Sequence, residues 1–126
     1  MQGLHLTADL SQCQCESAWL TDAKRLLDRC VQEVSHASLQ PVNQLAHSFP
    51  ATAQGPGGVT ATVLLAESHL CVHTWPEQMG VTVDVYVCNF GADHSAKAHA
   101  LMEALIVLFA PRDVLRQALQ RGGNNP

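Results

Sequence analysis

Alternating apolar and polar residues predict several β-strands along the chain. The segment 81–88 (VTVDVYVC) alternates most regularly, with four valines on one face and Thr82, Asp84, Tyr86 and Cys88 on the other. Because successive side chains of a strand point to opposite faces, this pattern is typical of a strand that is buried on one side. Strand patterns are also found at 3–10, about 42–49, 59–66 and 69–74.

Two longer segments have the 3.6-residue period of amphipathic helices. In 17–38 the apolar positions recur every three or four residues, at Trp19, Leu20, Ala23, Leu26, Leu27, Cys30, Val31 and Val34. In about 94–109 the apolar stripe is Ala98, Leu101, Leu105 and Leu108. Asp93 is expected to be the N-cap of this second helix. The tail 112–122 is ambiguous, because its residue types favour a helix while alternation also fits.

The order β-α-β-β-β-α predicts an α+β fold. It is typical of a two-layer sandwich, an antiparallel sheet with two helices on one face. The other face of such a sheet stays uncovered, and the polar residues of 81–88 would line it. The segment 50–58 (PATAQGPGG) contains two prolines and three glycines and is expected to be a loop.

Composition narrows the class of protein. A chain of 126 residues is expected to be a single domain, 1–126. The net charge of −4, without any Lys/Arg cluster, argues against nucleic acid or an anionic membrane as partner. Only 14% of residues are charged, which favours some surface being buried in an oligomer.

The first ten residues lack the basic start and long apolar core of a signal peptide. The chain contains no apolar run of the ~18–20 residues that a membrane span needs, and it has five cysteines, an odd number. These features predict a cytoplasmic protein with free thiols. The pair in 13-CQC-15 lacks the spacing of a zinc site, so no metal is expected.

Reactive side chains are concentrated in 66–77 (AESHLCVHTWPE), at Glu67, Ser68, His69, Cys71 and His73. The stretch GGVTATVLLAESHLCVHTWPE, followed by DVYVC, resembles the core of the small prokaryotic S-adenosylmethionine decarboxylases. GLHLTADLSQC at the N-terminus resembles the first strand of that family. The resemblance covers nearly the whole chain, is strong over 57–88 and thin after 110, and it favours a final strand at 113–120.

The resemblance implies a pyruvoyl-dependent lyase of polyamine and spermidine biosynthesis that makes its own cofactor. Ser68 Oγ would attack the carbonyl of Glu67, and elimination and hydrolysis would leave a pyruvoyl group on the new N-terminus. The proenzyme, a zymogen, would become a β chain (1–67) and an α chain (68–126). The pyruvoyl carbonyl would form a Schiff base with S-adenosylmethionine and delocalise the carbanion left by CO2, which no ordinary side chain can do.

The resemblance also implies roles for single residues. His73 would remove the α-proton of the ester intermediate, and the hydroxyl of Thr60 would assist this processing. Cys88 would protonate the α-carbon of the substrate after CO2 leaves. Glu77 would hold the ribose hydroxyls, and Phe49 would stack on the adenine.

The long 50–58 loop leaves the substrate open, because it extends the link from Phe49 to Thr60 beyond the family's usual length. Misplacing Phe49 would weaken adenosine binding, and relatives with the same chemistry act on ornithine or arginine. Such a substrate would need a carboxylate for its distal cation, which Asp84, Asp9 or Glu77 could supply. A non-catalytic dimeric binding subunit and a metal site are the remaining alternatives. The metal site would use His69, Cys71, His73 and Cys88.

The resemblance and the low charge together predict a homodimer. Its two sheets would face each other, so that the two-layer protomers form a four-layer αββα arrangement.

Overall fold

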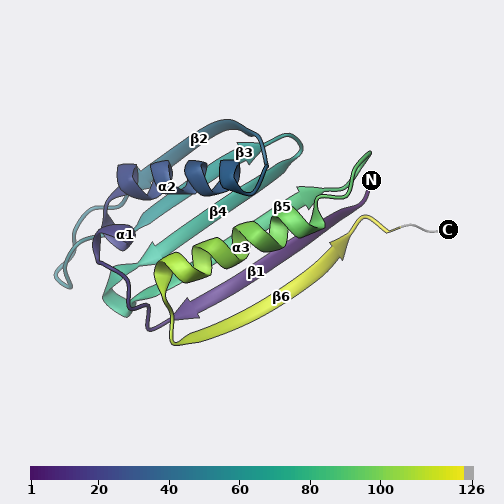
Figure 1. The fold of residues 1–126 in the computed structure, drawn as a ribbon. Helices are drawn as coiled ribbons and strands as arrows, with labels where there is room; N and C mark the ends of the chain where they lie inside the picture. The colour runs from purple at the N-terminus through teal and green to yellow at the C-terminus, as the bar shows by residue number, and fades with distance from the viewer. Residues whose placement is uncertain (124–126) are drawn as a thin grey trace.

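The computed structural model describes residues 1–123 and contains one six-stranded antiparallel sheet with helices on one face (Figure 1). The strands lie in the order β2-β3-β4-β5-β1-β6. The elements are β1 (Gly3–Ser11), α1 (Ala18–Thr21), α2 (Ala23–His36), β2 (Pro41–Ser48), β3 (Val59–Leu65), β4 (Ser68–Trp75), the 3-10 turn η1 (Pro76–Gln78), β5 (Gly80–Cys88), α3 (Ser95–Phe109) and β6 (Asp113–Arg121). The predicted α+β sandwich is therefore confirmed.

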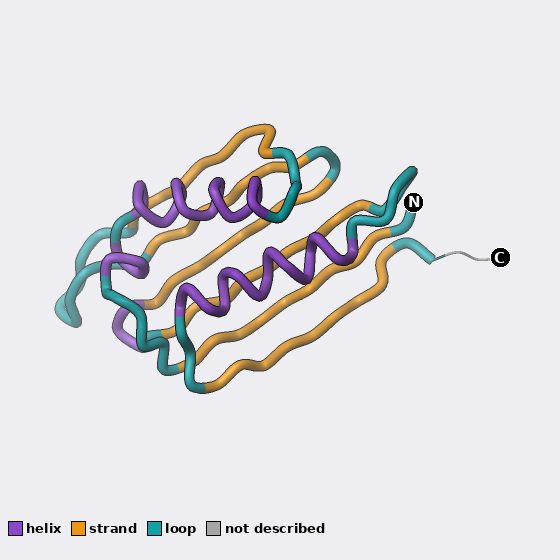
Figure 2. Tube along the Cα trace, viewed as in Figure 1, coloured by secondary structure: helices purple, strands orange, loops and turns teal. Residues whose placement is uncertain are grey.

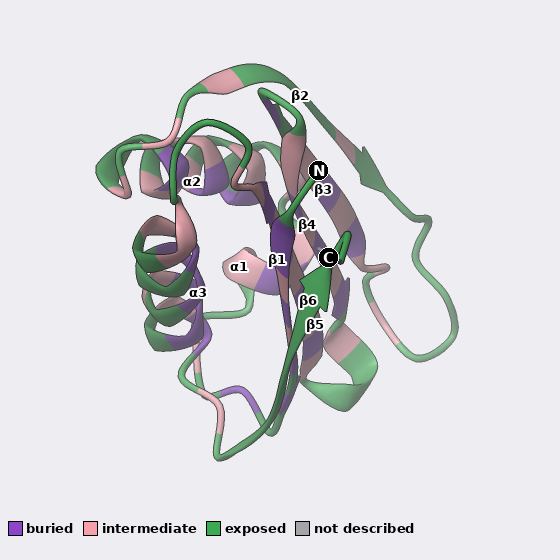
Figure 3. Cartoon of the chain, turned by 90° about the vertical axis from the view of Figure 1, so that its right-hand side faces the viewer, coloured by how far each residue is buried: buried purple, intermediate pink, exposed green. Residues whose placement is uncertain are grey.

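The core lies between the sheet and the two long helices, which cover the same face (Figures 2 and 3). α2 packs against β2 and β3, and α3 packs against β5 and β1. Leu26, Cys30 and Val34 of α2 are fully buried there, as are Leu101 and Leu105 of α3. Burying an apolar side chain of about this size stabilises the fold by roughly 1.5–3 kcal/mol. The buried residues of α2 and α3 therefore hold both helices on the sheet.

The predicted helix over 17–38 is wrong in one respect, because it is broken at Asp22. The backbone of Asp22 is extended, with φ −103° and ψ 104°, so α1 ends at Thr21 and α2 begins at Ala23. The Asp22 carboxylate accepts a hydrogen bond of 3.1 Å from the backbone N–H of Arg25. An aspartate favours this N-cap role over a helix interior, which explains the break.

The start of α3 also differs from the expectation, since its N-cap is His94 and not Asp93. Asp93 lies one residue earlier and accepts a 2.9 Å hydrogen bond from the N–H of Ser95. That bond lowers the pKa of Asp93. Within the predicted apolar stripe, Leu108 is only half-buried, whereas the following Phe109 is fully buried.

The ambiguous tail forms strand β6, which pairs with β1 at the edge of the sheet. Every residue of β6 is exposed, so burial does not hold it in place. Its backbone completes the free edge of β1, and Arg116 reaches across to form an ion pair with Glu103 of α3. Sheet pairing thus decides the conformation that residue types alone left open.

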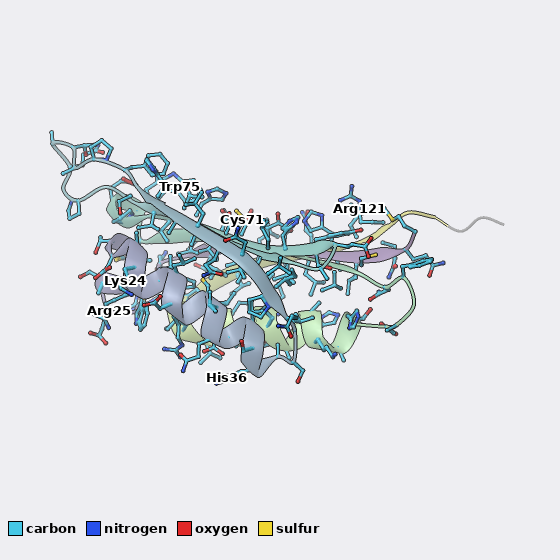
Figure 4. All side chains as sticks on the ribbon, turned by 90° about the horizontal axis from the view of Figure 1, so that it is seen from above. Lys24, Arg25, His36, Cys71, Trp75 and Arg121 are labelled. Carbon is cyan, nitrogen blue, oxygen red and sulfur yellow. The ribbon has the colours of Figure 1, made fainter. Side chains whose placement is uncertain are left out.

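The sheet surface opposite the helices, called the open face below, carries half-buried polar side chains. The valines of β5 are buried under the helices, and Thr82, Asp84, Tyr86 and Cys88 are half-buried on the open face, as the alternation predicts. Trp75, Cys71 and Arg121 likewise point away from the helices (Figure 4). Among the described residues, the helices are all too short or too polar to cross a membrane.

Candidate active site

The Glu67–Ser68 peptide lies in the tight turn between β3 and β4. Leu65 and Ser68 pair across this turn, so that Ala66 and Glu67 form its loop. Glu67 has φ +55°, in the left-handed region that side chains other than glycine seldom adopt. A residue held in this region stores roughly 1–3 kcal/mol of backbone strain. The bond that the sequence predicts to be cleaved therefore follows a strained residue.

Ser68 and Cys88 lie together at the start of β4. The backbone N–H of Cys88 donates a 2.9 Å hydrogen bond to Ser68 Oγ. This bond ties the serine hydroxyl to the end of β5, where the half-buried Cys88 thiol is located. The structure thus brings the predicted pyruvoyl precursor next to the predicted proton donor.

Thr60 and His73 form a second pair, on β3 and β4. They are cross-strand partners, and Thr60 Oγ1 is 2.8 Å from Nδ1 of His73. The other ring nitrogen, Nε2, is 3.4 Å from the sulfur of Cys71, which in turn is 3.4 Å from the hydroxyl of Thr62. Both nitrogens of the imidazole therefore have partners that fix its orientation.

A cavity of about 350 Å³ lies beside His73, at the end of β4. Phe49 and Trp75 contribute aromatic walls, and Glu77 reaches it from η1 directly after the strand. Its size falls within the range of small-molecule pockets, about 300–1,000 Å³. The long 50–58 loop does not displace Phe49 from Glu77, since both residues line this cavity. An aromatic face and a carboxylate are what a nucleoside needs.

The predicted residues do not form one site within a single chain. His73 is five positions after Ser68 on β4. A strand rises about 3.3 Å per residue, so the two residues are ~17 Å apart. The chain therefore carries two half-sites, one with Ser68 and Cys88 and the other with Thr60, His73, Phe49 and Glu77.

Between the half-sites lies a polar cluster on the open face that the sequence analysis did not identify. Asp84 of β5 bonds to Nε2 of His5 and lies 3.3 Å from Nε2 of His69. An Arg121 N–H is 3.1 Å from the other nitrogen of His5, which fits a neutral ring that donates to Asp84. Alternation already placed His5 and Asp84 on one face of their strands, but only the strand order brings them together.

The metal site considered from the sequence is not assembled in the described part of the chain. His73 contacts Cys71, while Cys88 lies at the Ser68 end of β4. The ligand atoms that do converge, within 4.8 Å of one another, belong to His5, His69 and Asp84. A metal-bound histidine usually donates its second N–H to an acceptor, whereas the second nitrogen of His5 faces the Arg121 cation. The cluster therefore suits a hydrogen-bond network better than a metal ion.

Comparisons with known proteins place the chain in one family. The family model described as S-adenosylmethionine decarboxylase matches residues 4–122. The S-adenosylmethionine decarboxylase proenzymes of Aquifex aeolicus (strain VF5) and of Sulfurihydrogenibium sp. (strain YO3AOP1) are each 35% identical over 121 residues. Each alignment covers 95% of this chain, and 81% and 82% of the relatives. The crystal structure of the adenosylmethionine decarboxylase from Aquifex aeolicus VF5 superposes with a TM-score of 0.81 at 31% identity, covering 98% of this chain and 92% of that one.

Proposed function

Because the chain belongs to the S-adenosylmethionine decarboxylase family, we propose that it cleaves itself at Glu67–Ser68 and then decarboxylates S-adenosylmethionine. The observation that carries the proposal is the geometry of this bond, where a strained Glu67 precedes a serine hydroxyl held beside Cys88. The matching family and relatives are named for this substrate. They favour it over ornithine, arginine or a non-catalytic role.

Self-cleavage needs only groups that the chain supplies, with water. Ser68 Oγ attacks the carbonyl carbon of Glu67, and the C–N bond breaks to give an ester and a free amine. A base then removes the α-proton of residue 68, and the Cβ–Oγ bond breaks to release the carboxylate of Glu67. Water finally replaces the nitrogen, which leaves as ammonia, so that residue 68 becomes a pyruvoyl group. Breaking the peptide also releases the backbone strain at Glu67.

The surroundings of Ser68 fit the group that would form there. Residue 68 begins β4, so the new chain start would remain anchored by the strand and by the N–H of Cys88. When present, the pyruvoyl carbonyl supplies the electron sink that decarboxylation requires. Cys88, whose N–H bonds to Ser68 Oγ, carries a thiol that can hold the proton that the α-carbon of the substrate takes up.

The base for the α-proton comes from a second copy of the chain. His73 suits this task because imidazole titrates near neutral pH, but its own Ser68 is ~17 Å away along β4. A two-fold axis between two facing sheets, perpendicular to their strands, lays the start of one β4 over the end of the other. Each Ser68–Cys88 half-site then meets a Thr60–His73 half-site.

The open face has the surface that such a homodimer needs. Leu45 and Leu64 are exposed on β2 and β3, and Leu115 and Leu119 are exposed on β6. Cross-strand pairing with open-face residues places all four on this face. Facing sheets would cover these leucines and give the four-layer αββα arrangement.

The cavity beside His73 accounts for substrate binding. Its Phe49 and Trp75 rings would stack on the adenine, and the two oxygens of Glu77 would accept from the vicinal ribose hydroxyls. A diamino acid has no sugar for Glu77 to hold. We therefore expect Glu77→Gln to impair binding of S-adenosylmethionine in particular.

Intact-protein mass spectrometry tests the proposal. The wild-type chain should convert to fragments 1–67 and 68–126, the second without a free N-terminal amine, while Ser68→Ala stays intact. CO2 release from S-adenosylmethionine, ornithine and arginine is then measured in parallel. An uncleaved wild-type chain after prolonged incubation would refute the pyruvoyl mechanism. Release from ornithine or arginine alone would refute only the substrate.

A further inference from the structure

The loop between β2 and β3 is an ordered part of the substrate cavity. The N–H of Phe49 donates a 2.9 Å hydrogen bond to the carbonyl of Gly58, which closes the base of the loop. At its tip, Thr52 and Gly55 exchange two backbone hydrogen bonds of 2.8 and 3.0 Å. The nine residues of 50–58 therefore form a closed structure with a defined tip.

Two glycines allow close backbone contacts at the base of this loop, one with Phe49 and one with β4. A Cβ at Gly57 would be 2.1 Å from the carbonyl oxygen of Phe49, and one at Gly58 would be 2.1 Å from that of Thr74. Only glycine permits such approaches of backbone to backbone. The sequence of the loop thus fixes its position at the end of β4.

The closed loop stands on the open-face side of the sheet. It rises beyond Trp75, away from the helices (Figures 3 and 4). Pro50 and Thr52 of the loop line the same cavity as His73 and Glu77. The loop therefore forms one wall of the cavity in which the proposed function places the nucleoside.

We propose that Thr52 is a further substrate-binding residue, whose hydroxyl donates a hydrogen bond to a ring nitrogen of the adenine. Thr52 Oγ1 already accepts from the backbone N–H of Gln54 at 3.1 Å, which leaves its own proton free to donate. A purine stacked on Phe49 buries ring nitrogens that are acceptors only, and leaving them without donors costs binding energy. This assignment rests on the proposed function.

Steady-state kinetics of the matured enzyme test this assignment. Thr52→Val removes the hydroxyl but keeps the branched shape, and should raise KM for S-adenosylmethionine about 2- to 12-fold, the range for one neutral hydrogen bond. Adenosine, which carries the base and ribose without the amino acid, should lose inhibitory strength by the same factor. The kcat and the extent of self-cleavage should not change, because Thr52 has no part in the bond-breaking steps.

Two further variants act as controls. Thr52→Ser keeps the donor and should retain the wild-type KM, and Ala53→Ser adds a hydroxyl to a neighbour that does not line the cavity. Equal adenosine inhibition of wild type and Thr52→Val would overturn the assignment while leaving the proposed function intact. A cleaved wild-type enzyme that does not act on S-adenosylmethionine would overturn the proposed substrate and this assignment together.

Discussion

The hydroxyl of Thr60 is the residue-level feature most directly tied to maturation. The hydroxyl forms a hydrogen bond with Nδ1 of His73, and this hydrogen bond should become stronger when the imidazole ring takes up a proton. Hydrogen bonds to charged groups contribute about 1.5–3 kcal/mol, so Thr60→Val should slow self-cleavage about 10- to 150-fold. Thr60→Ser keeps the hydroxyl and should cleave at least as fast as wild type. A Thr60→Val chain that matures at the wild-type rate would remove Thr60 from the mechanism.

The cysteines should differ sharply in reactivity. Burial raises the pKa of Cys30 to about 12, and burial with the neighbouring Cys15 raises the pKa of Cys13 to about 11. At pH 8 very little of the Cys30 side chain would be thiolate, the form that reacts. Iodoacetamide should therefore label Cys88 in the native protein and label Cys13 and Cys30 only after unfolding. Peptide mass spectrometry at increasing urea measures this, and equal native labelling of Cys30 and Cys88 would contradict it.

At the scale of elements, sequence periodicity predicts the order of strands and helices. It does not predict the conformation of a segment whose local propensity conflicts with its long-range contacts. The run from Val114 to Gln120 has helix-forming residues, yet it is a strand because β1 needs a partner for its free edge. Asp22 interrupts an otherwise continuous helical pattern because its side chain caps the next helix. Neither the strand at 114–120 nor the break at Asp22 depends on the spacing of apolar residues, and periodicity measures only that spacing.

The same limit applies to the active site. The roles of Ser68, His73 and Cys88 are predicted through the family resemblance, which is strong over 57–88, and residue types and spacing alone would not assign them. The division into two half-sites was not among these predictions, although five positions along a strand span ~17 Å. In contrast, the contact of Cys71 with His73 and the joining of His5 to Asp84 require the strand register and order.

The ion pair between α3 and β6 makes the stability of this edge of the sheet depend on pH. Arg116 donates two hydrogen bonds to Glu103 and lowers the pKa of its carboxyl. Because the folded pKa is lowered, the stabilisation is present above the ordinary glutamate pKa and is lost as the pH falls through the lowered one. Both groups are exposed, so the pair contributes only about 0.2–1 kcal/mol.

Glu103→Gln should therefore lower the free energy of unfolding by that small amount at pH 7. The difference from wild type should vanish at low pH, once Glu103 itself is protonated. Urea denaturation at several pH values measures this dependence, with Lys97→Gln, a charge change on the same helix, as the control. A difference between wild type and Glu103→Gln that does not vary with pH would contradict the role of the ion pair.

At the scale of the whole molecule, the layout of the open face fits the proposed homodimer. The helices cover one side of the sheet. The other side carries Thr60, His73 and Cys88, exposed leucines and the His5–Asp84–His69 cluster. The two-fold axis of the proposed dimer would pass close to Cys71, midway along β4 between Ser68 and His73. Residues paired across the strands near Cys71, such as Asp84, would then face the same residues of the second chain across the axis. The histidines bonded to Asp84 would keep two like charges from meeting unpaired.

The half-sites predict complementation between two inactive variants. Ser68→Ala keeps His73 but has no bond to cleave, and His73→Ala keeps Ser68 but lacks the base. Neither should mature alone, since general-base catalysis contributes about 100- to 10,000-fold. When the two are co-expressed, a mixed dimer places an intact His73 against an intact Ser68, and the His73→Ala chain should be cleaved. Differently tagged chains make the product visible by mass spectrometry. Cleavage of the His73→Ala chain by itself, or no cleavage in mixed dimers isolated with both tags, would mean that the base is not supplied by the second copy.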